Sequence, residues 1–341
     1  MTARLLVTLL GSAALLAAAG AQSAWAHDPS GKGGLPPIYV KRMQAAMKSL
    51  EAMDNSDAAR GVYSKLVQWP PSYAKVRVCF MGGSDAVNAK VAEIANRWSD
   101  DAGMGLKLDF GKAGKPRKCD PANRDAHIRV SYDKPGYWSL LGQNSYVYAT
   151  QEEASLNLDG FDQAADPAVL EQSELRGVIL HEFGHALGLL HEHQSPAANC
   201  VNEFNWQLIR ERLSQPPNGW DEETINFNMA PYVGEDLQLM MTDFDSASIM
   251  LYYFPPEFYL NGANSSCFIQ HENADISPAD RVTVNFMYSS DSAARIKNFE
   301  QNKAEFMKIW DAGMKTGATK AVGLDFPEVF LNPKGASGDE E

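Results

Sequence analysis

The side chains best suited to chemistry lie in one stretch of eleven residues, 181–191, with the pattern HExxHxxGxxH. On a helix, residues four positions apart lie roughly 40° apart around the axis and about 6 Å apart along it, so His181 and His185 can present their imidazoles to one ion. Glu182 lies beside this pair. Histidine nitrogen is a common zinc ligand, and the full pattern predicts a zinc site with an adjacent carboxylate.

His191 can be a third ligand only if the helix ends before residue 191. If the helix continued, His191 would lie about 120° from the face of the first two histidines and roughly 9 Å further along. Gly188 stands before it, and glycine adopts the left-handed conformation that ends a helix at little steric cost. The spacing therefore predicts His181, His185 and His191 as the ligands of one Zn²⁺ per chain. His193 is the rival third ligand, but its spacing favours a place beside the ligands.

Three neutral imidazoles leave one zinc position for water, which is typical of a catalytic site. Zinc lowers the pKa of such a water toward about 7, and a neighbouring carboxylate can take the remaining proton and pass it to a leaving amine. Glu182 is the predicted general base. In the alternative interpretation these are ordinary helix histidines and an exposed glutamate, which leaves the complete pattern unexplained.

Two stretches of the chain resemble the metzincin clan. Residues 181–191 match its zinc signature, and the sequence SIMLY at 248–252 is similar to its Met-turn. The astacin-like branch is the closer resemblance, because HEHQSP at 191–196 and FDxxSIM at 244–250 are similar to stretches of its bacterial members. The resemblance covers roughly residues 65–290.

The resemblance implies an α+β zincin fold. Such a fold has a twisted mixed sheet with two long helices in an N-terminal lobe, a smaller irregular C-terminal lobe, and zinc in the cleft between them. Met250 would form the hydrophobic floor beneath the histidines, and Tyr252 would be the zinc-side tyrosine that stabilises a tetrahedral oxyanion. Where the family usually has histidine this chain has Leu251, and a second aromatic residue, Tyr253, follows, so both tyrosines stay candidates. The predicted catalytic residues are Glu182 and Tyr252.

The first 26 residues predict a secretory signal peptide. Arg4 gives a positive start, residues 5–19 are almost entirely apolar, and Ala-Trp-Ala at 24–26 is a small-x-small cleavage signal. The apolar run is shorter than the roughly 20 residues of a membrane-spanning helix. We therefore expect a secreted or periplasmic protein without a membrane anchor.

The rest of the chain divides into three parts. Residues 38–60 have apolar side chains at helical spacing, which predicts an amphipathic helix. This segment is either a plain leader or a pro-segment in which Asp54 or Asp57 caps the zinc until it is removed. The predicted organisation is a signal peptide at 1–26, a leader or possible pro-segment at 27–64, a zinc metallopeptidase domain at 65–290, and a C-terminal helical and acidic tail at 291–341.

Composition sets the class of protein and its partners. The chain has 341 residues, 45% of them hydrophobic, and a net charge of −13. These values indicate a globular protein and disfavour nucleic acid and anionic membranes as partners. Four cysteines in the exported part can form disulfides in three pairings. We favour Cys79 with Cys119 and Cys200 with Cys267, because one pair then lies on each side of the zinc helix.

Alternating and helical patterns predict the remaining elements. The strand at 154–158 directly precedes the zinc helix, and we expect it to be an edge strand that either offers backbone groups to an extended peptide or is simply covered. The predicted strands are 75–81, 106–110, 126–132, 137–142, 146–150 and 154–158, and the predicted helices begin near 84, 166, 205 and 275.

The predicted function is that of a secreted zinc-dependent endopeptidase that hydrolyses internal peptide bonds of extended polypeptides. Its partner would be a protein or peptide substrate. The alternative is an exported binding or adhesion protein that retains the zincin scaffold without turnover. Glu182 discriminates between the two, because a binding module has no need of a general base. The sequence does not indicate an oligomeric state.

Overall fold

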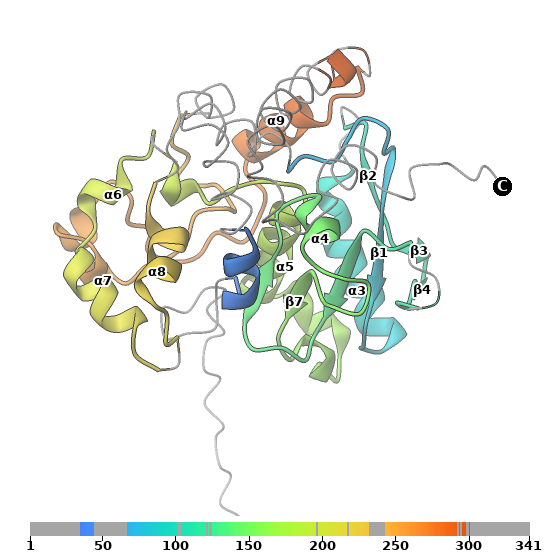
Figure 1. Ribbon diagram of the computed structural model, residues 1–341, viewed down its shortest axis with the longest axis horizontal. Helices are drawn as coiled ribbons and strands as arrows, with labels where there is room; N and C mark the ends of the chain where they lie inside the picture. The colour runs from blue at the N-terminus through green and yellow to red at the C-terminus, as the bar shows by residue number, and fades with distance from the viewer. Residues whose placement is uncertain are drawn as a thin grey trace, which may run out of the picture.

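The computed structural model shows two lobes side by side (Figure 1). The predicted signal peptide, Asp54, Asp57 and most of the predicted tail lie outside the residues that it describes. The described residues are 35–43, 67–100, 104–120, 122, 125–195, 197–216, 218–231, 243–291, 293, 295–297 and 300.

The first lobe contains a five-stranded mixed sheet in the order β2-β1-β5-β7-β6. The first four strands run parallel, and β6 runs antiparallel to β7. Val76 and Val78 of β1 are buried among the core side chains. The strands are β1 (Lys75–Phe80), β2 (Lys107–Asp109), β5 (Ile128–Ser131), β6 (Tyr137–Ser139) and β7 (Leu156–Leu158), and a separate hairpin consists of β3 (Gly111–Lys112) and β4 (Lys115–Pro116).

The two edges of this sheet are β2 and β6, so the expectation that 154–158 forms an edge strand is wrong. Leu156 pairs with Val130 on one side and with Ser139 on the other. The chain passes through β6 first and then returns, antiparallel, to insert β7 between β5 and β6. Sequence alternation identifies strands but carries no information on their order in a sheet.

The predicted strand at 146–150 is also wrong. Tyr146 and Val147 end the short helix α4 (Asn144–Val147), and residues 148–150 follow it in a turn. The buried guanidinium of Arg129 explains the difference, because it donates hydrogen bonds to the carbonyl oxygens of Ser145, Ala149 and Glu153. Because these carbonyl groups accept hydrogen bonds from the Arg129 side chain, they are satisfied without pairing to a neighbouring strand.

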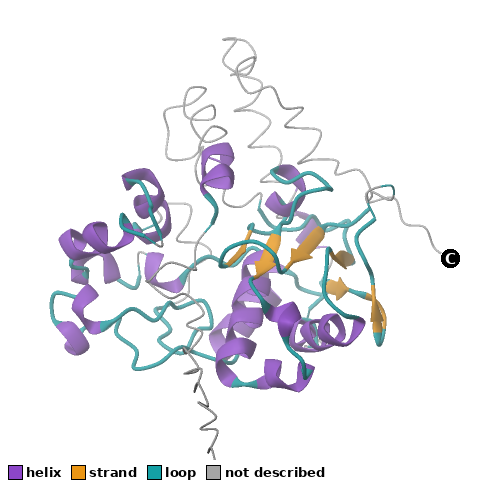
Figure 2. Cartoon of the chain, turned by 90° about the horizontal axis from the view of Figure 1, so that it is seen from below, coloured by secondary structure: helices purple, strands orange, loops and turns teal. Residues whose placement is uncertain are grey.

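Two long helices pack against one face of the sheet, as the second view of the chain shows (Figure 2). Helix α3 (Asp85–Ala95) begins at Ser84, whose hydroxyl accepts from Val87 N. Helix α5 (Ser173–Ala186) carries the first two histidines. We predicted a continuous helix from Asp166, but the structure has a 3-10 helix, η3 (Pro167–Glu171), and a break at Gln172 with an extended ψ of 141°.

The second lobe consists of helices and long loops. Among its described residues there is an isolated bridge between Phe204 and Tyr259 but no strand. Its own apolar cluster surrounds Cys200 and Cys267. The helices are α6 (Cys200–Glu203), α7 (Trp206–Leu213) and α8 (Glu222–Met229), and helix α9 (Pro278–Met287) returns to the core of the first lobe. The sequence did not predict α8.

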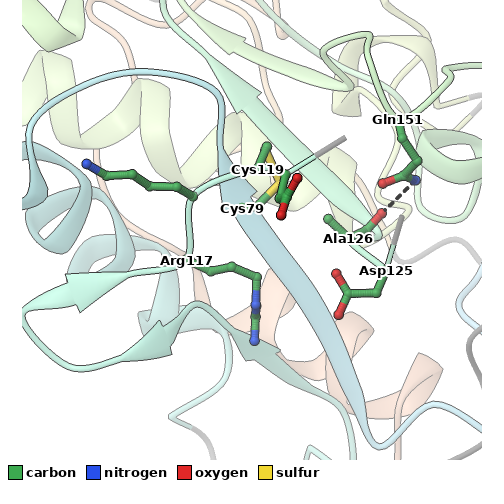
Figure 3. Close-up of a pocket in the computed structure, with 8 residues that line it drawn as sticks. Cys79, Arg117, Cys119, Asp125, Ala126 and Gln151 are labelled. Atoms are coloured by element: carbon green, nitrogen blue, oxygen red, sulfur yellow. Dashed lines mark hydrogen bonds between the residues drawn. A yellow bond between two sulfur atoms is a disulfide. The ribbon is translucent and has the colours of Figure 1, made fainter. Parts of the chain in front are cut away.

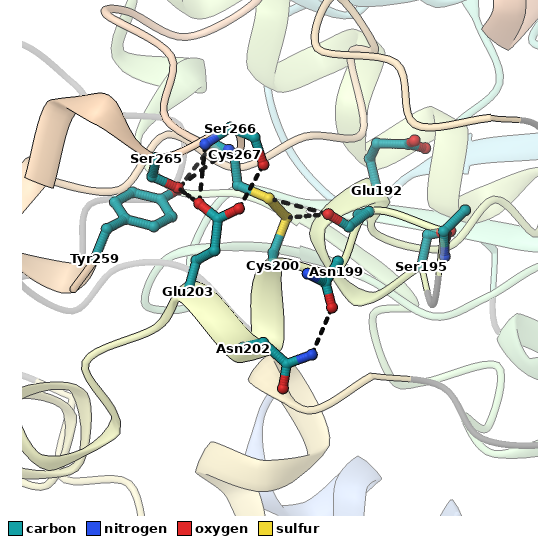
Figure 4. The surroundings of a disulfide bond; sticks show 12 residues. Glu192, Ser195, Asn199, Cys200, Asn202, Glu203, Tyr259, Ser265, Ser266 and Cys267 are labelled. Atoms are coloured by element: carbon teal, nitrogen blue, oxygen red, sulfur yellow. Dashed lines mark hydrogen bonds between the residues drawn. A yellow bond between two sulfur atoms is a disulfide. The ribbon is translucent and has the colours of Figure 1, made fainter. Parts of the chain in front are cut away.

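Both favoured disulfides are confirmed. Cys79 and Cys119 tie β1 to the loop after β4, beside a small pocket that Arg117, Asp125 and other polar residues line (Figure 3). Cys200 and Cys267 join two segments of the second lobe (Figure 4). Next to this bond, the Glu203 carboxylate accepts from Ser266 N at 2.9 Å. The two bonds therefore fasten one loop in each lobe.

The described part of the leader packs on the first lobe. Residues 37–43 are helical, and the side chains of Tyr39, Val40 and Met43 are buried. Tyr39 Oη donates to Ala154 O at 2.8 Å, and its ring lies 5.5 Å from that of Trp138 in β6. The rest of the predicted helix at 38–60 lies outside the described residues.

Candidate metal centre

The end of helix α5 brings the third histidine back toward the first two. The helix stops at Ala186, and Gly188 has a φ of +93°, in the left-handed region where glycine is favoured. Gly188 N then donates to His185 O at 2.7 Å and Leu189 N to Gly184 O at 3.0 Å, a hydrogen-bonding pattern typical of a glycine helix end. The predicted role of Gly188 as the helix stop is thus confirmed, and the chain turns so that His191 reaches the helix.

The three predicted ligands come together in the described part of the chain. Their donor nitrogens lie within 4.8 Å of one another. His185 Nε2 is 3.0 Å from His181 Nε2 and 2.9 Å from His191 Nε2. All three side chains are buried, with exposed fractions of 2%, 6% and 9% for His181, His185 and His191. Such a group of buried imidazoles matches the ligand set of a catalytic zinc site.

The hydrogen bonds of the outer ring nitrogens test whether a cation fits this cluster. His181 Nδ1 lies 2.7 Å from Ile249 O, and His185 Nδ1 lies 2.8 Å from Leu189 O. His191 Nδ1 lies 2.9 Å from Gln194 Oε1. An oxygen acceptor requires a proton on each Nδ1, so we assign the neutral tautomers in which each Nε2 carries a lone pair. Three lone pairs then converge on one point, and a cation there removes their repulsion.

Burial also favours the protonation state that binds metal. Desolvation lowers the pKa of His185 to about 4, and it holds the pKa of His191 well below the usual 6.5. Both imidazoles are therefore neutral near pH 7, and a neutral imidazole is the form that ligates a metal. The cluster consequently fits zinc in its donor type, its geometry and its protonation.

Glu182 follows the first ligand in α5 and is fully buried. Burial raises the pKa of its carboxyl well above the usual 4.5. A carboxyl group with a raised pKa can take up a proton and release it again near neutral pH. The position and environment of Glu182 thus suit the predicted role of a general base.

The structure distinguishes the two candidate tyrosines by position. The Tyr252 ring stacks on His181, with centroids 5.4 Å apart and planes 13° apart, and it lies 4.1 Å from the ring of His191. Tyr253 points to another neighbour, because its ring lies 6.4 Å from that of Phe268. Tyr252 is therefore the tyrosine at the histidine cluster.

Met250 packs against α5 at Gly184, between the two ligands that this helix carries. A β-carbon built on Gly184 would come within 2.5 Å of Met250 Sδ and 3.1 Å of Trp98 Cζ2. This close approach explains the glycine between Glu182 and His185, because any side chain there would displace the methionine. Met250 therefore lies against the helix segment that carries His181 and His185.

Two residues next to His191 connect it to other segments. His193 is buried, and its Nε2 lies 3.1 Å from Asn228 O in α8 while its ring stacks on His191 at 5.1 Å. It packs beside the third ligand and does not join the cluster. Glu192 Oε1 accepts from Asp245 N at 2.9 Å, which ties the ligand loop to the segment before the Met-turn.

Sequence reasoning missed two residues that hold the ligands, Gln194 and Asp280. Gln194 contacts His191 directly. Asp280 accepts from Ile249 N at 2.9 Å and so supports the residue whose carbonyl binds His181. A signal for Asp280 was available, because Ser277-Pro278-Ala279-Asp280 is a capping box. Gln194 has no such local signal, since its further partners lie in α8.

Comparison with known proteins points to the same class of protein as the histidine cluster, a zinc metallopeptidase. The model of the peptidase family Astacin matches residues 142–289. The zinc metalloproteinase nas-23 of Caenorhabditis elegans is 31% identical over 120 residues, which is 34% of this chain and 20% of that protein. The chain thus spans about a fifth of the length of this curated relative.

Two solved structures are similar to this one. The structure of myroilysin has a TM-score of 0.50 and 26% identity and covers 65% of this chain and 95% of that one. The hatching enzyme zinc-protease HCE-1 of Oryzias latipes has a TM-score of 0.39 and 16% identity, with 65% and 92% covered.

A mixed sheet, two long helices and a three-histidine cluster define a zincin-type metallopeptidase domain. Residues 142–289 thus form an astacin-like metzincin region, and the histidine cluster within it fits a zinc site.

Proposed function

We propose that this protein is a secreted zinc-dependent endopeptidase that hydrolyses internal bonds of extended polypeptides. The observation that carries the proposal is the convergence of three buried Nε2 atoms beside the buried carboxyl of Glu182. The two disulfides support an exported location, because such bonds persist in oxidising compartments. Within the described residues, the structure has no helix with the length and apolar character of a membrane span.

His181, His185 and His191 would hold the zinc ion in the proposed mechanism. Zinc in such a site supplies a Lewis acid that activates water and polarises a carbonyl group. Glu182 takes the proton of the attacking water and returns it to the leaving amine. The Tyr252 hydroxyl, next to the ligands, donates to the oxygen on which negative charge develops.

The edge strand β6 is the proposed binding site for the substrate backbone. β6 pairs with β7 on one side, and no described strand pairs with its other side. An extended peptide can add to such an edge through main-chain hydrogen bonds. Helix α5 contacts both β6 and β7, so a peptide bound along β6 lies next to the helix that carries Glu182.

The test is the variant Glu182→Gln in the full chain. We expect it to bind one zinc per chain as the wild type does and to lose about 10²- to 10⁴-fold in peptide hydrolysis, since general-base catalysis contributes about that much. Glu174→Gln is the matched control, because Glu174 is an exposed carboxylate in the first turn of the same helix. An unchanged rate in Glu182→Gln would remove the base role. A wild-type protein that binds zinc and peptide without cleaving it would instead support the binding-protein alternative.

The packing of the leader supports its proposed role as a pro-segment. Tyr39 lies against Trp138 of β6 and bonds to Ala154 O, and Arg42 pairs with both oxygens of Glu153 at 2.9 and 3.0 Å. These contacts place the helical residues 37–43 beside the proposed substrate strand.

We expect the full chain with Tyr39→Ala and Arg42→Ala to hydrolyse a peptide faster than the wild type before any leader removal. Ile38→Ala is the control, because the Ile38 side chain is 53% exposed. The pro-segment role is wrong if the double variant is no faster and the fully active wild type still carries its leader, as N-terminal sequencing would show.

A further inference from the structure

The third histidine, His191, differs from His181 and His185 in the kind of group that its Nδ1 atom hydrogen-bonds to. His181 Nδ1 and His185 Nδ1 bond to the backbone oxygens of Ile249 and Leu189. His191 Nδ1 bonds to a side chain, the amide oxygen of Gln194, at 2.9 Å. A backbone acceptor is fixed by the fold, whereas this acceptor depends on the identity of one residue.

Helix α8 fixes the amide group of Gln194. Gln194 Nε2 donates to Phe227 O at 2.9 Å and to Ala230 O at 2.8 Å. The last carbonyl groups of a helix have no partner within the helix, and here the Gln194 amide supplies partners at the end of α8. Because both amide protons go to carbonyl oxygens at the C-terminal end of α8, the amide oxygen faces His191. Gln194 is buried, with 1% of its surface exposed.

Neighbouring contacts strengthen the connection between the ligand loop and α8. His193 Nε2 lies 3.1 Å from Asn228 O, the carbonyl next to that of Phe227. Asn228 Nδ2 in turn donates to Thr224 O, one turn earlier, at 2.8 Å. Two consecutive side chains of the ligand loop thus bind the C-terminal turn of one helix.

We propose that Gln194 is a positioning residue for the third zinc ligand. By accepting the proton of His191 Nδ1, it fixes the tautomer and the ring orientation that point Nε2 at the metal, and α8 holds the Gln194 amide in place. Groups that accept from the outer nitrogen of a ligating histidine commonly change metal affinity about 10- to 100-fold when removed. The inference rests on the zinc site of the proposed function and not on peptide hydrolysis.

The experiment measures zinc affinity by chelator competition and the visible absorption of the Co²⁺-loaded protein, in the full chain. Gln194→Met has a similar length but cannot accept from His191, and we expect it to bind zinc about 10- to 100-fold more weakly, with an altered Co²⁺ spectrum. Gln194→Glu retains an acceptor for His191 Nδ1 but loses both donors to α8. We therefore expect it to lose thermal stability while keeping zinc affinity closer to that of the wild type.

Asn88→Leu is the matched control. Its buried side-chain amide donates to Gly82 O and accepts from Tyr132 Oη, with no ligand among these partners. This variant should unfold at a lower temperature with unchanged zinc affinity, which separates a general loss of stability from a loss at the metal site.

The outcomes are distinct. Zinc affinity of Gln194→Met within twofold of the wild type overturns the proposal, and so does a Gln194→Glu variant that loses as much affinity as Gln194→Met. If the methionine variant fails to fold, the comparison of Gln194→Glu with the wild type still decides, because a tenfold loss there contradicts the acceptor role. A wild-type chain that binds no zinc would refute the proposed function itself.

Discussion

The side chains of Ser248 and Asp280 are hydrogen-bonded, with Ser248 Oγ donating to Asp280 Oδ1 at 2.7 Å. The other carboxylate oxygen accepts from Ile249 N and from Ser277 N, both at 2.9 Å. Ile249 O bonds to His181 Nδ1 at 2.7 Å. The first turn of α9 therefore holds the Met-turn, and through it the orientation of the first ligand.

Replacing Asp280 by Asn should destabilise this arrangement. The amide nitrogen of Asn cannot accept from a backbone N–H, so at least one of the buried donors loses its partner. Hydrogen bonds to charged groups contribute about 1.5–3 kcal/mol each, and we expect the free energy of unfolding to fall by about 2–4 kcal/mol in urea titrations.

Asp275→Asn is the control for this change. The Asp275 carboxylate pairs with Arg176 but is 71% exposed. Exposed ion pairs contribute roughly 0–1 kcal/mol, so this variant should unfold almost as the wild type does. Equal stabilities of the Asp280 and Asp275 variants would show that α9 does not support the Met-turn.

Gly188→Ala should weaken the metal site through the backbone. The φ of +93° at Gly188 is unfavourable for any residue with a β-carbon and costs roughly 1–2 kcal/mol. Space is not the obstacle, since the nearest atom to a new β-carbon is Met287 Cε at 3.5 Å. Relaxing the strain moves the turn that returns His191 to the helix, so we expect lower thermal stability together with weaker zinc binding in chelator competition.

Gly160→Ala provides the comparison for this prediction. Gly160 has a φ of +74°, and a β-carbon there meets no atom within 4 Å. It should lower the unfolding temperature to a similar extent and leave zinc affinity unchanged. If both variants retain wild-type zinc affinity, the orientation of His191 does not depend on the turn at Gly188.

The parts of the site that could be predicted from the sequence are those encoded locally. His181, His185, Gly188 and His191 lie within one helix and its end, where residue spacing alone determines their relative positions. The position of Tyr252 was given by the resemblance, and its distinction from Tyr253 needed the rings around it.

The parts that could not be predicted depend on contacts between distant segments. Gln194 acquires its place from Ala230, 36 residues later, and no periodic pattern links the two. The same holds for β6 as the edge strand, because the antiparallel return that places β7 inside the sheet is a property of the whole chain path. The register of β6 with Asn157 is visible only once both strands are in the sheet.

His127 should make the stability of the protein depend on pH, independently of the metal site. Its ring is buried beside Tyr73 and Trp69, and its Nδ1 accepts from Arg77 N at 2.9 Å. Burial lowers the pKa of His127 to about 3, and the positive charges of Arg77, Arg129 and Arg117 act in the same direction, opposed by Asp109. The imidazole therefore remains neutral in the folded protein under conditions that protonate it in the unfolded chain.

The sign of the effect follows from this difference. Between the unfolded pKa of about 6.5 and the folded pKa of about 3, the unfolded chain binds more protons, so stability falls as the pH is lowered. At 1.36 kcal/mol per pH unit, His127 alone should remove about 3 kcal/mol between pH 6.5 and pH 4. His127→Phe cannot take up this proton. We expect it to be less stable at pH 7, because Arg77 N loses its acceptor, but to have a shallower decline toward pH 4.

Urea unfolding of the full chain at several pH values measures both slopes. Other buried histidines contribute equally to the wild type and the variant, so the difference between the slopes isolates His127. His271→Phe, at an exposed position, should retain the wild-type slope. Parallel pH profiles for His127→Phe and the wild type would mean that the folded protein accommodates a proton on His127, most directly by releasing the Arg77 N hydrogen bond and admitting water to the ring.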